Sequence, residues 1–181
     1  PKNNEIYPSG VNKKIKINSF GKRLCGKNRP GHFEAIADVI DRFINIIKPN
    51  NIYFGKKDMQ QLKIMEDFIK KNYPKVKVVG CNTIRDKSGI ALSSRNFLLS
   101  KKEISIASNI YNFLLKNKKK ILNNKNLTHK FKCNIIKLGA NKIDYLKIIN
   151  INKIIKPYKK RKKNKIFIAY FLRSTRLIDN I

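Results

Sequence analysis

Residues 51–62, with the sequence NIYFGKKDMQQL, decide the fold of the first half of the chain. The run Asn51–Phe54 predicts a short buried strand, which Gly55 ends. A helix is expected to follow and to stop at Tyr73, because Pro74 comes next. Its apolar side chains recur at helical spacing; these are Leu62, Met65, Phe68 and Ile69. A strand followed at once by a helix is typical of a parallel α/β sheet.

The neighbouring segments extend this pattern. The apolar stripe in Phe33–Ile47 predicts a preceding helix, which Pro49 ends. The run Val76–Val79 predicts a second strand that ends at Gly80. The resulting helix–strand–helix–strand order predicts parallel strands, because a strand–helix–strand crossover returns the chain in the same direction.

The first part of the chain is expected to be incomplete as a sheet. Val11, Ile15 and Ile17 indicate one short additional strand. The two firm strands with two helices leave a sheet edge and both faces poorly covered, and such a sheet rarely stands alone. Further strands are therefore expected to precede Pro1.

The pattern changes near residue 82. Ser100 and Glu103 form a capping box that opens a helix, with an apolar stripe that reaches Leu114 and extends toward Ile121. Further elements are expected in this order: a helix from Thr128 to Gly139, a strand over residues 143–149, a loop with a basic run at 159–163, and a strand over residues 165–172. The sequence therefore predicts an α/β piece over residues 1–82 and a smaller α+β piece over residues 83–181.

The charge of the chain is strongly positive and has two interpretations. The 181 residues include 42 Lys and Arg against 11 Asp and Glu, a formal net charge of +31. One interpretation is a basic nucleic-acid-binding module. The other is a solvated surface that follows base composition, since 34 Lys, 23 Asn and 29 Ile share A/T-rich codons. Only 8 of the basic residues are Arg, which favours the solvated surface and predicts no specific nucleic-acid partner.

Cysteine content and hydropathy bear on the cellular compartment of the protein. Cys25, Cys81 and Cys133 are far apart and form no C-x-x-C pair, which argues against a disulfide framework or a zinc site and favours a reducing cytoplasm. The longest apolar run, residues 166–172, is far shorter than the roughly 20 residues of a membrane helix. No membrane partner is therefore expected.

The first candidate site follows the strand at residues 51–54, since open parallel sheets bind ligands beyond the carboxyl ends of their strands. Gly55 lets a ligand approach the backbone, and Lys57 offers a mobile charge for phosphate. Asp58 accepts either from ribose hydroxyls or from the backbone N–H groups of the helix that it would cap. Gln61 lies one turn further on and can both donate and accept.

Two further segments are candidates. Leu92–Asn96 places two hydroxyls and a guanidinium in succession, which suits anionic oxygens, although a plain polar loop explains it equally well alone. Arg29 and His32 lie at a helix start and could form an anion pocket, but a lone His is more often structural. No carboxylate cluster for a metal ion is evident.

Taken together, these segments resemble the pantothenate synthetase (pantoate–β-alanine ligase) family. The matching motifs, in order, are EIYP at 5–8, LCG at 24–26, RPGHF at 29–33, YFGKKDMQQL at 53–62, LSSRN at 92–96 and RLIDN at 176–180. The resemblance covers essentially the whole chain. It implies ATP-dependent condensation of (R)-pantoate with β-alanine through a pantoyl adenylate, a ligase reaction in the pathway to coenzyme A.

The resemblance also implies a fold and a set of site residues. The fold is the C-terminal part of a Rossmann-like nucleotidyltransferase domain (residues 1–82) followed by a small α+β lid domain with an antiparallel sheet (residues 83–181), which is expected to close over the nucleotide. The ATP-binding residues are Gly55, Lys56, Lys57, Asp58, Ile84, Leu92, Ser93, Ser94 and Arg95. Lys57 and Arg95 are the catalytic candidates, and Gln61 is implied to hold pantoate. Mg²⁺ accompanies ATP, and the complete protein is implied to be a cytoplasmic homodimer.

The chain departs from the family pattern in three places. Lys56 and Cys25 each replace a usual Glu, and Ser174-Thr175 is a loose match before Arg176. The family's N-terminal third, with its catalytic His and a substrate-binding Gln, has no counterpart here. The chain as given is therefore expected not to complete the reaction by itself, and a non-catalytic remnant of the enzyme is the alternative.

Overall fold

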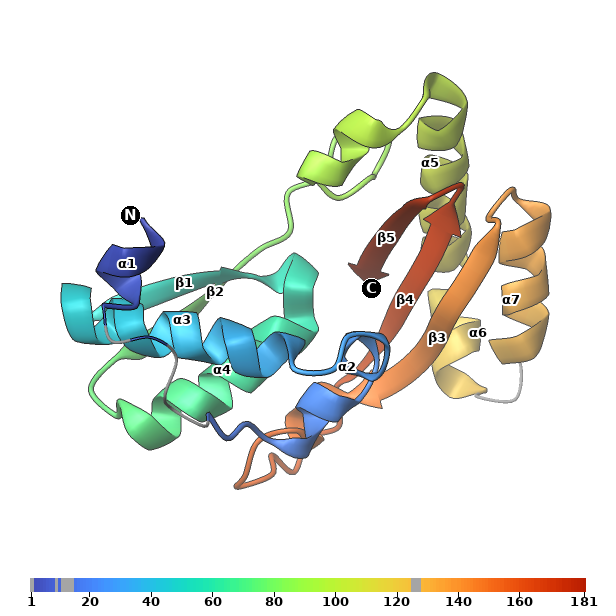
Figure 1. Ribbon diagram of the computed structural model, residues 1–181. Helices are drawn as coiled ribbons and strands as arrows, with labels where there is room; N and C mark the ends of the chain where they lie inside the picture. The colour runs from blue at the N-terminus through green and yellow to red at the C-terminus, as the bar shows by residue number, and fades with distance from the viewer. Residues whose placement is uncertain (1, 9, 11–14, 125–127) are drawn as a thin grey trace. The chain divides into compact units, whose positions relative to one another are not determined.

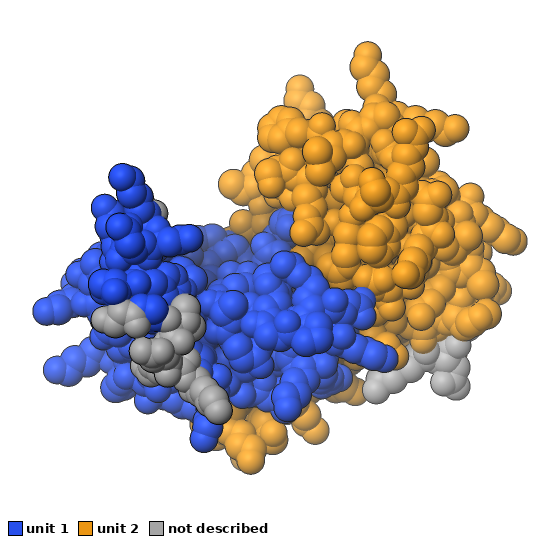
Figure 2. All heavy atoms as spheres, viewed as in Figure 1, with its two compact units in different colours: residues 1–81 blue, residues 82–181 orange. Residues whose placement is uncertain are grey.

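The computed structural model describes residues 2–8, 10, 15–124 and 128–181. The chain divides into two compact units, residues 1–81 and 82–181, which are coloured separately in Figure 2. The first contains a parallel two-stranded sheet and the second an antiparallel three-stranded sheet, each with helices (Figure 1). The expected mixed α/β architecture is therefore confirmed.

The first unit is built around one strand–helix–strand repeat. β1 (Asn51–Gly55) leads through the 3₁₀ helix η2 (Lys56–Asp58) into α4 (Met59–Asn72), and β2 (Lys77–Cys81) then pairs parallel to β1. The helix expected before β1 is α3 (His32–Ile47). These four elements confirm the sequence-based order.

Helix α4 carries the core of this unit because its apolar stripe faces inward. Ile64, Met65 and Ile69 are completely buried, and Phe33 and Ala37 of α3 are buried as well. Tyr73, at the C-terminal end of α4, joins the two helices because its hydroxyl donates to the Asp41 carboxylate of α3.

The strand expected around Ile15 and Ile17 does not form, and Val11 lies outside the described residues. Ile17 packs against Gly21 instead, and the side chain of Asn18 accepts from the Phe20 N–H at 3.1 Å. This cap turns the chain into the 3₁₀ helix η1 (Ser19–Lys22). Two short helices were not predicted: α1 (Asn3–Ile6) and α2 (Cys25–Asn28).

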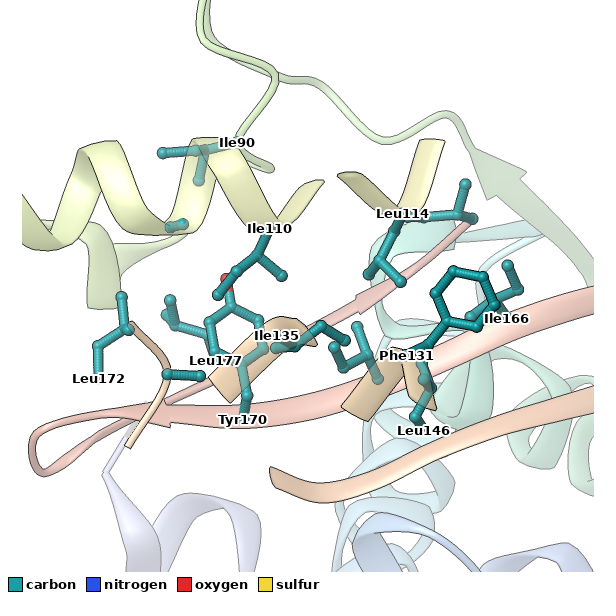
Figure 3. Close-up of a cluster of buried hydrophobic side chains, with 14 of the residues drawn as sticks. Ile90, Ile110, Leu114, Phe131, Ile135, Leu146, Ile166, Tyr170, Leu172 and Leu177 are labelled. Atoms are coloured by element: carbon teal, nitrogen blue, oxygen red, sulfur yellow. The ribbon is translucent and has the colours of Figure 1, made fainter. Parts of the chain in front are cut away.

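The second unit packs three helices on a sheet with the strand order β3-β4-β5. The strands are β3 (Lys142–Asn150), β4 (Asn164–Leu172) and β5 (Thr175–Asn180), and the helices are α5 (Lys101–Lys116), α6 (Lys118–Asn123) and α7 (Thr128–Lys137). Figure 3 shows Ile110 and Leu114 of α5 in one cluster with Leu146, Ile166 and Tyr170 of the sheet. This cluster is the core of the unit.

The local signals in this unit were mostly correct. The capping box forms, because the Ser100 N–H donates to Glu103 Oε2 at 2.8 Å and the Glu103 N–H donates to Ser100 Oγ at 3.3 Å. The stripe expected to run on to Ile121 is broken at Asn117, although Ile121 reaches the core from α6. Strand β5 was not predicted, since its sequence was identified only as a family motif.

Candidate functional site

The turn after β1 presents the first candidate segment. Gly55 has an ordinary extended backbone, with φ −69° and ψ 131°, so its conformation does not require glycine. A β-carbon placed there would meet no heavy atom within 4 Å. The space beside Gly55 is therefore open, as the expected close approach of a ligand to the backbone requires.

Lys57 and Asp58 bring opposite charges together in this turn. Lys57 Nζ lies 3.5 Å from Asp58 Oδ1, and the Lys57 side chain is 20% exposed whereas that of Asp58 is 45% exposed. Asp58 occupies the N-cap position of α4, but its side chain accepts no capping hydrogen bond. The capping interpretation of Asp58 is therefore wrong, and its carboxylate faces solvent beside a cation.

Lys56 is held differently from Lys57. A β-carbon on Gly80 of β2 would lie 3.3 Å from Lys56 Cε and 3.2 Å from Leu62 Cδ2. The aliphatic stem of Lys56 therefore packs on the neighbouring strand.

The two adjacent glutamines have different surroundings. Gln60 is buried: its Oε1 accepts from the Cys25 N–H at 3.1 Å, and its Nε2 donates to Phe20 O at 2.8 Å and to Arg23 O at 2.7 Å. Gln61 is only partly buried, which is compatible with contact to a substrate. Sequence reasoning missed the role of Gln60, since its partners lie about forty residues upstream.

The second candidate segment is a short hairpin in the second unit. The Leu92 N–H donates to Ile84 O at 3.0 Å and the Asp86 N–H donates to Ile90 O at 3.0 Å, with Arg85 bridged to Ala91. Ile84 and Leu92 therefore lie opposite each other, and both are exposed. The structure thus brings together two positions that the resemblance assigns to ATP.

Residues 93–95 continue from this hairpin into the 3₁₀ helix η3 (Ser94–Leu98). Ser93 Oγ accepts from the Arg95 N–H at 3.3 Å, so Ser93 serves as the cap of this turn. Ser94 and Arg95 are exposed, and Arg95 Nη1 donates to Arg176 O at 2.6 Å. The polar-loop and anion-binding interpretations are both compatible with this geometry.

The RLIDN motif at 176–180 lies in β5, and its two charged side chains form ion pairs, one of them with the hairpin. Arg176 Nε lies 2.7 Å from Asp144 Oδ2, and the Arg85 guanidinium binds both carboxylate oxygens of Asp179, at 2.7 and 2.9 Å. Burial alone would lower the pKa of Arg85, but the Asp179 carboxylate outweighs it, so the net pKa is raised. Arg85 therefore keeps its charge at any ordinary pH.

The remaining candidates show no assembled site. The His32 ring packs beside the Phe33 ring, with the centroids 5.0 Å apart, and Arg29 is exposed at the entry to α3. In the described residues, no group of three or more His, Cys, Asp or Glu side chains could hold a metal ion. None of the helices in the described part of the chain combines the length and apolar composition that a membrane span needs.

Comparisons with known proteins agree over the whole chain. The family model described as pantoate-beta-alanine ligase matches residues 1–181. A pantothenate synthetase from Sulfurihydrogenibium is 39% identical over 188 residues, covering 100% of this chain and 66% of the relative, and one from Ruthia magnifica is 36% identical over 182 residues with the same coverage. The chain therefore spans just under two thirds of the length of these curated relatives.

Solved structures give the same result. Pantothenate synthetase from Thermus thermophilus superposes with a TM-score of 0.85 at 28% identity, covering 100% of this chain and 67% of that one. The Francisella tularensis pantoate-beta-alanine ligase, complexed with β,γ-ATP and β-alanine, has a TM-score of 0.77 at 35% identity and covers 98% of this chain and 61% of that one. By its motifs, its fold and these matches, the chain belongs to the pantoate–β-alanine ligase (pantothenate synthetase) family.

Proposed function

We propose that this chain serves the ATP-dependent condensation of (R)-pantoate with β-alanine. In the first step a pantoate carboxylate oxygen attacks the α-phosphorus of ATP, a P–O bond forms, and pyrophosphate leaves with the electrons of the broken bond. In the second step the β-alanine amine attacks the acyl carbon of pantoyl adenylate. The new amide C–N bond replaces the acyl C–O bond, AMP leaves, and the amine gives up a proton. No protein nucleophile is needed, so the protein acts by positioning and electrostatic stabilisation.

The turn after β1 supplies the first group of residues for this reaction. Lys57 neutralises charge that builds on the phosphates, and Asp58 accepts from ribose hydroxyls. Support for both roles comes from their position at the carboxyl end of a parallel strand and from the exposed Asp58 carboxylate. The open space beside Gly55 suits a backbone contact, Lys56 contributes through its backbone, and partly buried Gln61 holds pantoate.

The hairpin and the turn after it supply the second group. Ile84 makes a backbone contact to ATP, and Leu92, Ser93, Ser94 and Arg95 surround its phosphates. A guanidinium carries five N–H donors, so Arg95 can hold Arg176 O and still bind phosphate oxygens. On this proposal residues 1–82 are the C-terminal part of a Rossmann-like nucleotidyltransferase domain, and residues 83–181 are an α+β lid domain. The parallel β1–α4–β2 unit and the construction of the second segment wholly within residues 82–181 support this division.

Mg²⁺ enters this proposal only as part of the ATP substrate. The described residues offer no dedicated cluster of metal ligands, and Mg²⁺ is usually held by substrate phosphates with few protein carboxylates. No step is therefore assigned to a protein-bound metal. A homodimer and a cytoplasmic location are proposed from family membership.

The observation that carries the proposal is the match of the whole chain to the family, with the Gly55–Asp58 turn at the carboxyl end of β1. The test uses the chain extended with the third of the family's length that it does not span. Exchange of labelled pyrophosphate into ATP should require pantoate but not β-alanine, because adenylate formation precedes amide formation. Exchange that requires β-alanine would contradict a free adenylate. No exchange and no pantothenate formation would indicate a non-catalytic remnant.

A further inference from the structure

The hairpin at residues 84–92 has too short a ladder to define its own conformation. Its pairing rests on the Ile84–Leu92 and Asp86–Ile90 hydrogen bonds, and isolated two-stranded hairpins are marginally stable in water. Interactions from elsewhere in the second unit must therefore fix its geometry. The structure shows which ones do.

Arg85 connects the hairpin to two other elements, β5 and α5, and also bonds to the tip of the hairpin itself. Its guanidinium makes the two-pronged ion pair with Asp179 of β5, donates to Gly89 O at 3.0 Å, and lies 4.2 Å from the centroid of the Tyr111 ring on α5. The Arg85 side chain is only 20% exposed and that of Asp179 15%, so solvent screens this pair less than a surface pair.

The tip of the hairpin fits the same surface. Gly89 has φ +88°, and a β-carbon there would come within 2.5 Å of the Tyr111 ring, so only glycine suits this position. Ser108 Oγ of α5 donates to Ser88 O at 2.7 Å. Helix α5 therefore receives the tip, and strand β5 holds the arm that carries Arg85.

The turn that follows is fixed to the same strand. Arg95 Nη1 donates to Arg176 O, and Asn96 Nδ2 donates to Ala91 O at 3.1 Å. The segment from Ile84 to Arg95 is thus attached to β5 at two points three residues apart, Arg176 and Asp179. Leu92, Ser93 and Ser94 lie between the two attached residues, Arg85 and Arg95, and Ile84 directly precedes Arg85.

We propose that Asp179, acting through Arg85, is a positioning residue that sets the conformation of residues 84–95 for ATP. This inference rests on the proposed function, since it deepens the role of the same segment. Asp179 itself touches no substrate on this view. Its removal leaves two cations without their neighbouring carboxylate, because Lys165 also lies within electrostatic range of Asp179. The released Arg85 then no longer ties the hairpin to β5.

The first test needs no activity and uses the 181-residue chain. Asp179→Asn and Arg85→Ala should each speed hydrogen exchange at the Asp86 and Leu92 amides at least tenfold, while amides in the β3–β4 ladder keep their protection. Arg85→Lys should resemble Arg85→Ala, because an ammonium cannot bind both carboxylate oxygens. Unchanged exchange at these two amides would overturn the inference.

The second test measures kinetics in the extended chain. Asp179→Asn should lower kcat/KM for ATP by about 10–100-fold through misplacement of the loop, with KM for pantoate unchanged. The double variant Arg85→Ala/Asp179→Asn should have a kcat/KM for ATP no lower than that of the less active single variant, because both substitutions remove the same ion pair. Asn150→Ala is the matched control: it removes hydrogen bonds to Asn152 and Lys163 elsewhere in this unit and should leave the ATP parameters unchanged.

The outcomes separate the two proposals. If the unaltered extended chain shows no pantoate-dependent exchange of pyrophosphate into ATP, the proposed function is refuted. The hydrogen exchange of the Asp86 and Leu92 amides still tests the positioning role in that case. An active chain in which Asp179→Asn keeps the original ATP parameters refutes the positioning role alone. Equal rises in KM for ATP and for pantoate would also refute it, since that is the result of general destabilisation.

Discussion

Gln60 and Gln61 allow a sharp comparison, because they are adjacent on α4 and differ in surroundings. Gln60→Ala removes three hydrogen bonds: the buried ones with Cys25 and Phe20 and a partly buried one with Arg23. At about 1 kcal/mol each, the expected loss in free energy of unfolding is about 3 kcal/mol. Gln61→Ala removes a partly buried side chain and should change stability by less than about 0.5 kcal/mol.

The assay is urea unfolding of the 181-residue chain followed by far-ultraviolet circular dichroism, with limited proteolysis of residues 20–28 as a local readout. Gln60→Ala should shift the unfolding midpoint to lower urea and expose the 20–28 segment to cleavage, whereas Gln61→Ala should do neither. In the extended chain, Gln61→Ala should instead raise KM for pantoate. Equal stability losses for the two variants would refute the reasoning from burial.

Further expectations concern charge and pH. Lys57→Ala should lower kcat of the extended chain by about 10²–10³-fold, and Lys56→Glu should be mild by comparison; similar effects would contradict the assigned roles. Burial and the Asp41 hydrogen bond raise the pKa of Tyr73 to about 12 from 10.0. The stability that its hydroxyl provides is therefore fully present below pH 10 and lost as the pH rises through 12, so the difference in unfolding free energy between the unaltered chain and Tyr73→Phe should shrink over that range. The Ser100 hydroxyl, helped by its backbone N–H, lowers the pKa of Glu103 from 4.5, so Glu103→Gln should destabilise at neutral pH and lose that effect as the pH falls below the native pKa. If the +31 charge is a solvated surface, filter binding to DNA or RNA should be weak, independent of sequence and abolished by physiological salt.

Most of the fold was predictable because its signals are local. Helix α4 and strand β1 follow from an apolar stripe and a glycine break, and α5 follows from the Ser100–Glu103 capping box. In each case the deciding residues lie within about four positions of one another. Such signals hold when tertiary packing agrees with local preference, as it does here.

The missed features depend on partners far away in the sequence. Strand β5 carries Arg176 and Asp179, whose charges argue against a half-buried strand until Asp144 and Arg85 neutralise them. Gln60 is buried because residues 20–25, which run from η1 into α2, fold over it. No local sequence pattern indicates these contacts, so strand β5 and the burial of Gln60 could not be predicted from the sequence.

The same contrast between local signals and distant partners applies to the candidate site. The chemistry of Lys57, Asp58 and Arg95 could be inferred from residue type, because phosphate and ribose call for cations and a carboxylate. The attachment of the hairpin to β5 could not be inferred, since Asp179 lies 94 residues beyond Arg85. The RLIDN motif entered as a family resemblance without a role of its own. Within it, Asp179 forms the ion pair with Arg85 that ties the ATP-binding candidate segment to β5, and Arg176 pairs with Asp144 of β3. These partners give a physical reason for a motif whose charged residues lie in a strand.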